Sequence, residues 1–311
     1  MDVISRDRLP RHFVQATLDL HGERGSRWLE DLAITVTECE RRFHVRATRV
    51  ASDLSYGLVL WVDGADGPAV LKLAVPDKDL IAEARALTLY GGRAAVRLLS
   101  VWPERGALLL ERVHPGSPLA LVTDDRQAME AIATFARELW LTLDDHSGLA
   151  RVDDWVSGLS RLRRRFDGGT GPLPSRLVDG AERVFQTLLA TSPQPRLIHG
   201  DLHYGNILAA ERRAWLAIDP KGVIGEPAFD VGYLLANPSA HLLESTRPAD
   251  RVLADRIAFL PDALGVDRER VVAYAFATSV LSAWWSLEDH GRGWERAVAV
   301  AELLEPKLSH G

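Results

Sequence analysis

Three oxygen-bearing side chains occur close together in the second half of the chain. Asp201 and Asn206 are five residues apart in the segment Ile-His-Gly-Asp-Leu-His-Tyr-Gly-Asn, and Asp219 ends the later segment Trp-Leu-Ala-Ile-Asp. A loop of this length can direct three oxygen ligands at one point. Phosphoryl transfer needs a carboxylate that takes or orients the proton of an acceptor hydroxyl, and oxygen ligands for Mg²⁺ at the phosphates. The spacing predicts Asp201 as the base and Asn206 and Asp219 as the metal ligands.

Length and composition set broad limits on the class of protein. The 311 residues are 47% hydrophobic and 26% charged, which suffices for a sizeable core and for two lobes. A formal net charge of −6 argues against nucleic acid as a partner. Cys39 is the single cysteine, so an internal disulfide is excluded and a reducing cytoplasm is favoured.

No secretory signal and no apolar run of membrane-spanning length is visible in the sequence. We therefore expect a cytoplasmic protein with no membrane partner. It would act on a small-molecule acceptor as a monomer or a weak homo-oligomer.

Apolar spacing divides the chain into two parts. Residues 11–43 carry apolar groups at helical spacing, interrupted at His21-Gly22 and at Gly25, and predict two helices. The next 70 or so residues contain short β-like runs separated by Gly-containing turns, with one helix over 79–90. This predicts a small antiparallel sheet with strands at 45–51, 58–62, 69–74, 96–102 and 107–113.

After a hinge-like segment, His114-Pro115-Gly116-Ser117-Pro118, the pattern becomes mostly helical. Strand pairs are expected around the segment that contains Asp201. The predicted helices are at about 123–143, 151–166, 174–191, 227–236, 249–260, 267–289 and 291–305.

A small sheet lobe, a hinge and a helical lobe with the catalytic loop are the arrangement of protein kinases and their relatives. The chain resembles the aminoglycoside phosphotransferase family, and within it the subgroup of streptomycin 6-phosphotransferases and hydroxyurea phosphotransferases. The resemblance covers nearly the whole chain. The family motifs are His199-Gly200-Asp201-Leu202-His203 with Asn206, Ile218-Asp219-Pro220, and Pro227, Phe229 and Asp230; the subgroup is indicated by residues 70–73, 83–87, 91–92, 108–112, 215–222, 225 and 288–289.

The resemblance implies an α+β, protein-kinase-like fold with a small antiparallel-sheet N-lobe and a mostly helical C-lobe. Residues 1–112 would form the nucleotide-binding lobe, with extra N-terminal helices. Residues 113–311 would form the catalytic and substrate lobe.

The resemblance also implies ATP and Mg²⁺ as cofactors. Lys72, in an apolar strand, would contact the α- and β-phosphates and pair with Glu83, eleven residues later on a helix. A strand-edge lysine that extends to water beside an unrelated glutamate is the alternative. The hinge from Glu111 to Val113 would offer a backbone carbonyl and an amide to adenine.

The phosphate-binding loop departs from the kinase pattern. Protein kinases place Gly-x-Gly-x-x-Gly between the first two strands, whereas this chain has Ala-Ser-Asp-Leu-Ser-Tyr-Gly over 51–57. Backbone amides and the Ser55 hydroxyl can contact phosphate oxygens there. A polar turn that only connects two strands fits the segment equally well.

The resemblance to the family also implies roles for several further residues. His199 is expected to be structural and to pack near Asp219, and Asp230 to bind the backbone of the catalytic loop. His203 orients the loop or lines the acceptor site. Near the C-terminus, Glu288 and Asp289 would bind a guanidinium of the acceptor through paired, charge-assisted hydrogen bonds. The alternative is that they are ordinary acids at a helix end, solvated or paired with Arg292.

Other functions fit parts of the pattern. Asp201-Leu202-His203 also resembles the start of a two-metal phosphoesterase site, but the later histidines lack ligand-like spacing. A non-catalytic nucleotide-binding pseudokinase would keep the fold without turnover, yet the catalytic set is complete. We expect an ATP- and Mg²⁺-dependent kinase of a small-molecule hydroxyl, most similar to enzymes that inactivate streptomycin. A hydroxyurea phosphotransferase, or a kinase of another hydroxylated amine or metabolite, is the alternative.

Overall fold

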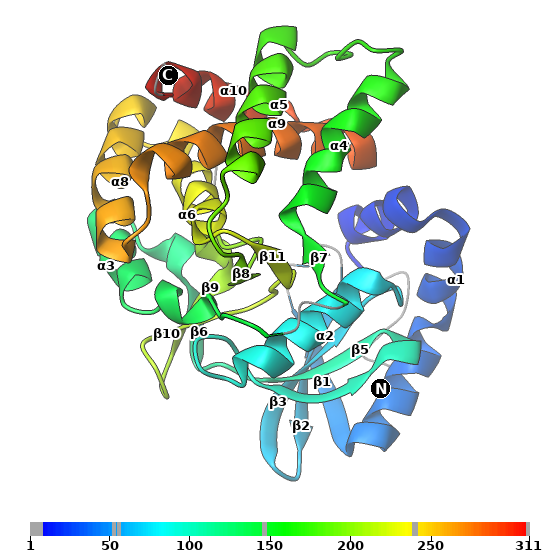
Figure 1. Ribbon diagram of the computed structural model, residues 1–311. Helices are drawn as coiled ribbons and strands as arrows, with labels where there is room; N and C mark the ends of the chain where they lie inside the picture. The colour runs from blue at the N-terminus through cyan, green and yellow to red at the C-terminus, as the bar shows by residue number, and fades with distance from the viewer. Residues whose placement is uncertain (1–8, 52–53, 55–56, 145–147, 238–241, 309–311) are drawn as a thin grey trace. The chain divides into compact units, whose positions relative to one another are not determined.

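The computed structural model describes residues 9–51, 54, 57–144, 148–237 and 242–308 (Figure 1). The chain forms two compact units, Met1–Gly116 and Ser117–Gly311. Each unit has buried apolar residues of its own.

The first unit is built on a five-stranded antiparallel sheet in the order β1-β2-β3-β5-β4. Alternation along β3 directs Ala69, Leu71 and Leu73 to one face, where they are buried, and places Lys72 on the other. The five predicted strands are therefore confirmed, with small shifts at their ends. Their bounds are β1 Val45–Val50, β2 Leu58–Gly64, β3 Gly67–Leu73, β4 Leu98–Trp102 and β5 Ala107–Glu111.

Helix α1 (Arg11–Phe43) covers the apolar face of this sheet. Its apolar residues recur every three or four positions, and Trp28, Leu32 and Val36 join the buried cluster that contains the strand residues. Gly22 has φ +53° and ψ −129°, so the helix is broken there into two segments, as the sequence predicted. Gly25 does not break the helix; a Cβ at this position would lie 2.6 Å from the Thr17 carbonyl oxygen.

Helix α2 (Lys78–Tyr90) begins at Asp77, whose carboxylate accepts hydrogen bonds from the amides of Asp79 and Leu80. It ends at Gly91, which has φ +56°. Glu83 and four apolar residues of this helix are buried. The helix thereby presents one acidic group among its buried residues.

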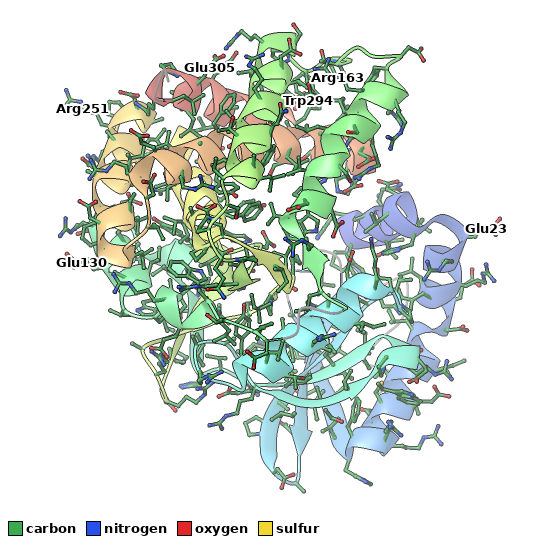
Figure 2. The ribbon with its side chains drawn as sticks, viewed as in Figure 1. Glu23, Glu130, Arg163, Arg251, Trp294 and Glu305 are labelled. Atoms are coloured by element: carbon green, nitrogen blue, oxygen red, sulfur yellow. The ribbon has the colours of Figure 1, made fainter. Side chains whose placement is uncertain are left out.

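The second unit is mostly helical. Helix α9 (Arg268–His290) is buried along most of its length and contacts five other helices of the unit. Ion pairs reinforce some of the remaining contacts: Arg163 of α4, labelled in Figure 2, binds Asp179 and Glu182 of α5. The helices are α3 Asp125–Ala133, α4 Val152–Arg165, α5 Ser175–Ala190, α6 Pro227–Ala236, α8 Ala249–Leu264, α9 and α10 Glu295–Leu304.

One predicted helix is much shorter than expected. Instead of spanning 123–143, α3 ends at Ala133, a short 3₁₀ turn follows, and Leu141 forms backbone hydrogen bonds with Leu197. The apolar residues that prolonged the helical spacing are buried in these new contacts, and the indole of Trp140 donates to Asp230. Tertiary packing here overrides local periodicity.

Two small sheets complete the second unit. Strands β9 (Ile207–Ala210) and β10 (Trp215–Ala217) form a hairpin, and β6 (Pro115–Pro118) pairs with β9. The other sheet has the order β7-β11-β8, with bounds Ala150–Arg151, Val223–Gly225 and Arg196–Ile198. None of the helices in the described part of the chain combines the length and apolar composition that a membrane span requires.

Candidate active site

The β9–β10 hairpin brings Asn206 and Asp219 together. Its register places Ile207 opposite Ala217, so the residues just outside the ladder, Asn206 and Ile218, also face each other. The Ile218 amide donates to the Asn206 carbonyl at 2.9 Å. Residues thirteen positions apart in the sequence are thereby neighbours at the open end of one hairpin.

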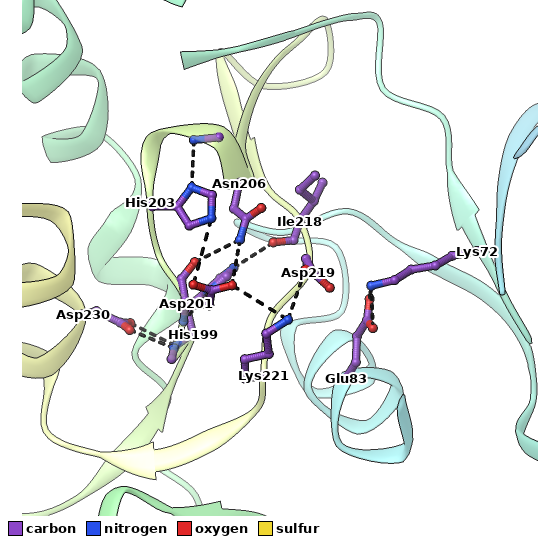
Figure 3. A network of polar contacts seen from close by, with 12 residues as sticks. Lys72, Glu83, His199, Asp201, His203, Asn206, Ile218, Asp219, Lys221 and Asp230 are labelled. Carbon is purple, nitrogen blue, oxygen red and sulfur yellow. Dashed lines mark hydrogen bonds and ion pairs between the residues drawn. The ribbon is translucent and has the colours of Figure 1, made fainter. Parts of the chain in front are cut away.

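Asp219 occupies an uncommon backbone conformation. Its φ is +58°, a left-handed value that non-glycine residues seldom adopt and that is enriched at functional sites. Two residues later the Lys221 amide donates to the His199 carbonyl at 2.8 Å. This turn holds the Asp219 side chain beside the loop that begins at His199 (Figure 3).

Asp201 and Asn206 are joined through the Asn206 amide. Its nitrogen donates to the Asp201 carbonyl at 3.0 Å and lies 3.4 Å from the Asp201 carboxylate. The amide oxygen is then the atom directed away from these contacts. The Asp201 side chain is 22% exposed, and burial raises its pKa above the ordinary value, against the lowering effect of Lys221 and His203.

His199 is fully buried, and its ring joins the loop at Asp201 to the end of the strand at Ile218. Its Nε2 lies 2.9 Å from the Ile218 carbonyl, and its Nδ1 accepts from the Asp201 amide at 3.2 Å. Burial lowers the pKa of His199 to about 3, so the ring is neutral and Nε2 is the protonated nitrogen that donates. This geometry supports a structural role for His199.

Asp230, in the first turn of α6, accepts three hydrogen bonds that fix the start of the loop. The amides of His199 and Gly200 donate to it at 2.9 and 2.8 Å, and the Trp140 indole donates at 3.1 Å. It is fully buried, and burial raises its pKa to about 6 although these donors oppose the shift. The contacts are those expected of a carboxylate that binds the catalytic-loop backbone.

His203 has a local contact of its own. Its Nδ1 accepts from the Gly205 amide at 3.0 Å, which leaves Nε2 on the side of Asp201, 3.9 Å from the carboxylate. The ring is thus held by the loop and partly exposed, and this supports both the loop-orienting and the acceptor-lining alternatives.

The first unit carries the other predicted pair. Lys72 Nζ of β3 lies 2.7 and 2.8 Å from the two carboxylate oxygens of Glu83 on α2. Their side chains are only 17% and 8% exposed. The alternative of a solvent-directed lysine beside an unrelated glutamate is therefore wrong as a description of this pair.

Glu288 already binds a guanidinium, that of Arg161. Two hydrogen bonds of 2.8 Å join Nε and Nη2 of Arg161, on α4, to the two oxygens of Glu288, on α9. The adjacent Asp289 is half-buried, and burial together with the Glu288 charge raises its pKa. Glu288 is therefore engaged within the protein, and the expectation that Glu288 and Asp289 each bind a guanidinium of the acceptor stays a prediction.

Helix α4 packs against the catalytic loop through Trp155, which also contacts Trp285 of α9. Trp155 and Trp285 are in edge contact, with ring centroids 5.8 Å apart. A Cβ on Gly200 would lie 2.8 Å from the Trp155 ring, so the loop packs closely against α4. The Arg161–Glu288 pair lies about two helical turns along α4 from Trp155.

Two nucleotide-site predictions have less to support them. Ser55 lies outside the described residues. At the predicted hinge, the Glu111 amide donates to the Arg97 carbonyl at 2.9 Å, and the Glu111 carboxylate accepts from the Arg97 amide. The Glu111 amide is thus engaged within the protein, and the adenine contacts expected of the hinge stay a prediction.

Comparison with known proteins identifies the family of the chain. The model of the aminoglycoside/hydroxyurea antibiotic resistance kinase family matches residues 42–290. The chain belongs to this family. It is therefore a small-molecule kinase, and the expectation of a phosphotransferase is confirmed. The phosphoesterase and pseudokinase alternatives have no support from this comparison.

Two characterised relatives have similar sequences over most of their length. The streptomycin 6-kinase of Streptomyces glaucescens is 34% identical over 287 residues, which cover 91% of this chain and 92% of the relative. The hydroxyurea phosphotransferase of Kitasatospora aureofaciens is 34% identical over 307 residues, which cover 95% of this chain and 85% of the relative.

The fold of the kinase is shared with solved structures. One is a thermostable mutant of an aminoglycoside phosphotransferase in ternary complex with ADP and hygromycin B, with a TM-score of 0.59 at 14% identity. The similarity covers 88% of this chain and 97% of that chain. The predicted α+β, protein-kinase-like fold is confirmed.

Sequence reasoning missed three polar features of the kinase. Lys221, one of only four lysines in the chain, contacts both catalytic-loop carboxylates, and its rarity was the available signal. Arg161 gave no signal, because its partner lies 127 residues away. The buried Arg256 also gave no signal in the sequence; it binds Asp125 and lies over the ring of Tyr204 in the catalytic loop.

Proposed function

We propose that this kinase transfers a phosphoryl group from ATP, with Mg²⁺, to a hydroxyl of an aminoglycoside, as a streptomycin 6-kinase does. The observation that carries the proposal is the arrangement of Asp201, Asn206 and Asp219 around the open end of the β9–β10 hairpin. The 34% identity to streptomycin 6-kinase over nearly the whole chain supports the acceptor class.

The donor atoms fit Mg²⁺. Asn206 offers an amide oxygen because its nitrogen is committed to Asp201, and Asp219 offers a carboxylate. In the described ranges, no cluster of three or more His, Cys, Asp or Glu side chains has the geometry of a metal site. Mg²⁺ in kinases is commonly bound by one or two protein oxygens, with phosphates and water completing the octahedron. When bound it would neutralise charge on the phosphates.

For the nucleotide, we propose that Lys72 contacts the phosphates and that Glu83 fixes the position of its ammonium group. The two short contacts between them support this assignment. Adenine would bind the Glu111 carbonyl and the Val113 amide. The ADP complex of the related fold supports a nucleotide as the phosphoryl donor.

At the reacting centre, the Asp201 carboxylate would accept the proton of the acceptor hydroxyl or orient the hydroxyl for in-line attack. Its position is fixed by the Asn206 amide and by the His199 ring behind the loop. Burial raises the pKa of the Asp201 carboxyl, and a carboxylate with a raised pKa is a better proton acceptor than an ordinary one. Fixing this group before the reaction removes an orientational cost from the transfer step.

For the acceptor, we propose that Asp289, together with Trp155 of α4 and Trp285 of α9, binds a cationic group, with His203 nearer the reacting hydroxyl. Asp289 is half-buried beside Glu288, and a carboxylate with a raised pKa gains from a cationic partner. Glu288 would take part only if Arg161 moves away from it.

Phosphorylation of hydroxyurea is the second candidate. Hydroxyurea is small and neutral, so it needs no free carboxylates, and the engagement of Glu288 by Arg161 favours an acceptor of that kind. The equal identity to hydroxyurea phosphotransferase supports this alternative.

An acceptor panel tests the proposal. Purified protein is incubated with Mg·ATP and streptomycin, hydroxyurea, another aminoglycoside or an amino-alcohol, and products are identified by mass. We expect a singly phosphorylated streptomycin.

Asp201→Asn should reduce turnover by ~10² or more, the range of general-base catalysis, with folding preserved. Asp31→Asn, on the exposed side of α1, is the control. If only hydroxyurea is phosphorylated, the proposed acceptor is wrong and hydroxyurea takes its place. If Asp201→Asn keeps full turnover, the assignment of Asp201 as the base is wrong.

A further inference from the structure

Lys221 lies between the two carboxylates of the active site. Its Nζ is 3.1 Å from Asp219 Oδ2 and 3.8 Å from Asp201 Oδ2 (Figure 3). One ammonium group is therefore within ion-pair distance of both the proposed base and the proposed metal ligand. No part of the proposed function above uses this lysine.

Backbone contacts fix the position of the Lys221 main chain, while its ammonium group can still move. The Lys221 amide donates to the His199 carbonyl, and the following Gly222 has φ +60°, so the chain turns sharply at this point. A Cβ on Gly200 would lie 3.3 Å from the Lys221 Cβ, which shows how closely the stem packs on the catalytic loop. The side chain is still 37% exposed, and its four-carbon stem can carry the ammonium group several ångströms.

The chemistry of phosphoryl transfer gives such a cation a use. Negative charge is spread over the oxygens of the phosphoryl group as it passes between donor and acceptor. That group must lie between the base, which faces the acceptor, and the metal ligand, which faces the donor. Lys221 contacts both of these residues, and lysine is an effective point charge for phosphate oxygens.

We propose that Lys221 is a further catalytic residue of this kinase: its ammonium group bridges Asp201 and Asp219 before the substrates bind, and contacts the oxygens of the phosphoryl group during transfer. The proposal rests on the proposed function. It forms and breaks no covalent bond; the lysine supplies positive charge, and the proton of the acceptor hydroxyl still goes to Asp201.

Lys221→Met tests the proposal, because methionine keeps most of the stem and removes the charge. With saturating Mg·ATP and acceptor, kcat should fall by about 10², the loss typical of removing one group that stabilises transition-state charge. The KM of each substrate should change by less than about threefold, since the contact strengthens in the transition state. Lys221→Arg should recover part of kcat, because it restores charge with different geometry. Lys78→Met, at an exposed lysine of α2, is the control.

A second measurement does not depend on turnover. In EDTA, Lys221→Met should unfold at a lower temperature than wild type, because the two carboxylates lose their shared cation. Mg²⁺ without nucleotide should then raise the unfolding temperature of the variant at lower concentration than it does for wild type, since lysine no longer competes for Asp219. An unchanged kcat together with this stability change would overturn the proposal and leave Lys221 a counter-ion. Absence of kinase activity in wild type would instead refute the proposed function.

Discussion

Lys72 and Glu83 form a shielded ion pair, and such a pair behaves differently from one at the surface. Removing one partner leaves the other charge partly buried without compensation, which costs more than the pair contributes in net terms. The contacts of 2.7 and 2.8 Å and the low exposure of both side chains place this pair in the shielded class.

Stability and activity should therefore separate in a double-mutant cycle. We expect Lys72→Met to reduce the free energy of unfolding by roughly 2–3 kcal/mol, somewhat less than for a fully buried pair. Glu83→Gln in the same chain should restore part of that loss, because no uncompensated carboxylate remains, while kcat/KM for Mg·ATP stays low. Urea unfolding and steady-state kinetics measure the two quantities.

Arg126→Met provides the matched control for this cycle. Arg126 and Glu130 form a 2.7 Å pair on α3, but their side chains are 61% and 55% exposed. The Arg126 guanidinium also lies 4.2 Å from the centroid of the Phe259 ring, so its loss should cost about 1 kcal/mol or less and leave the nucleotide kinetics unchanged. If Lys72→Met is as mild as this control in both measurements, Lys72 has no part in nucleotide binding.

At the scale of elements, the predictable parts are those determined by neighbours in sequence. Apolar runs and helical spacing sufficed to predict a strand at Lys72 and a helix at Glu83, whereas the pairing of the two residues came from the resemblance to the phosphotransferase family. The hairpin that unites Asn206 with Asp219 was likewise visible as two apolar runs. The end of α3 could not be predicted from the sequence. The indole of Trp140 donates to Asp230, ninety residues away, and no local sequence pattern indicates that partner.

The pairing of α4 with α9 through Arg161 and Glu288 has the same long-range origin and bears on the acceptor. Arg161→Met should free the Glu288 carboxylate for an external guanidinium, so we expect KM for streptomycin to fall severalfold and KM for hydroxyurea to stay the same. Asp289→Asn should raise KM for streptomycin severalfold. Both effects should shrink at high salt, because partly exposed charges are screened.

Arg163→Met, two residues along α4, is the control for this prediction. It breaks ion pairs with Asp179 and Glu182 of α5 but leaves Arg161 and Glu288 in place. KM for streptomycin should then be that of wild type. A KM that is the same in all three variants would place the recognition of the acceptor's cationic groups outside the α4–α9 pair.

At the scale of the whole molecule, buried titratable groups of the active site link folding to pH. His199 has a pKa of about 3 in the folded chain and about 6.5 when unfolded, so the unfolded chain binds its proton more readily. The stability associated with His199 is present above pH 6.5 and is lost as the pH falls toward 3. Asp230 has the opposite effect on stability. Its pKa is raised from 3.8 to about 6, so the stability associated with Asp230 is lost as the pH rises through 6.

Because the two groups oppose each other, the effect of His199 is best measured as a difference between variants. Between pH 7.5 and 5.0, wild type should lose about 2 kcal/mol more stability than His199→Asn, from about 1.36 kcal/mol per pH unit over the roughly 1.5 units below 6.5. Urea unfolding in EDTA at the two pH values gives the four free energies required. Asparagine can still accept from the Asp201 amide, although the Ile218 carbonyl loses its donor.

His199→Asn should therefore be less stable than wild type at pH 7.5 and closer to it at pH 5.0. His44→Asn, at the exposed left-handed residue that ends α1, should follow wild type at both values, since asparagine tolerates that conformation. Parallel curves for wild type and His199→Asn would mean that the ring does not stay neutral in the folded chain. The hydrogen bond from His199 to Ile218 would then be the wrong explanation for how the catalytic loop is held against the strand that leads to Asp219.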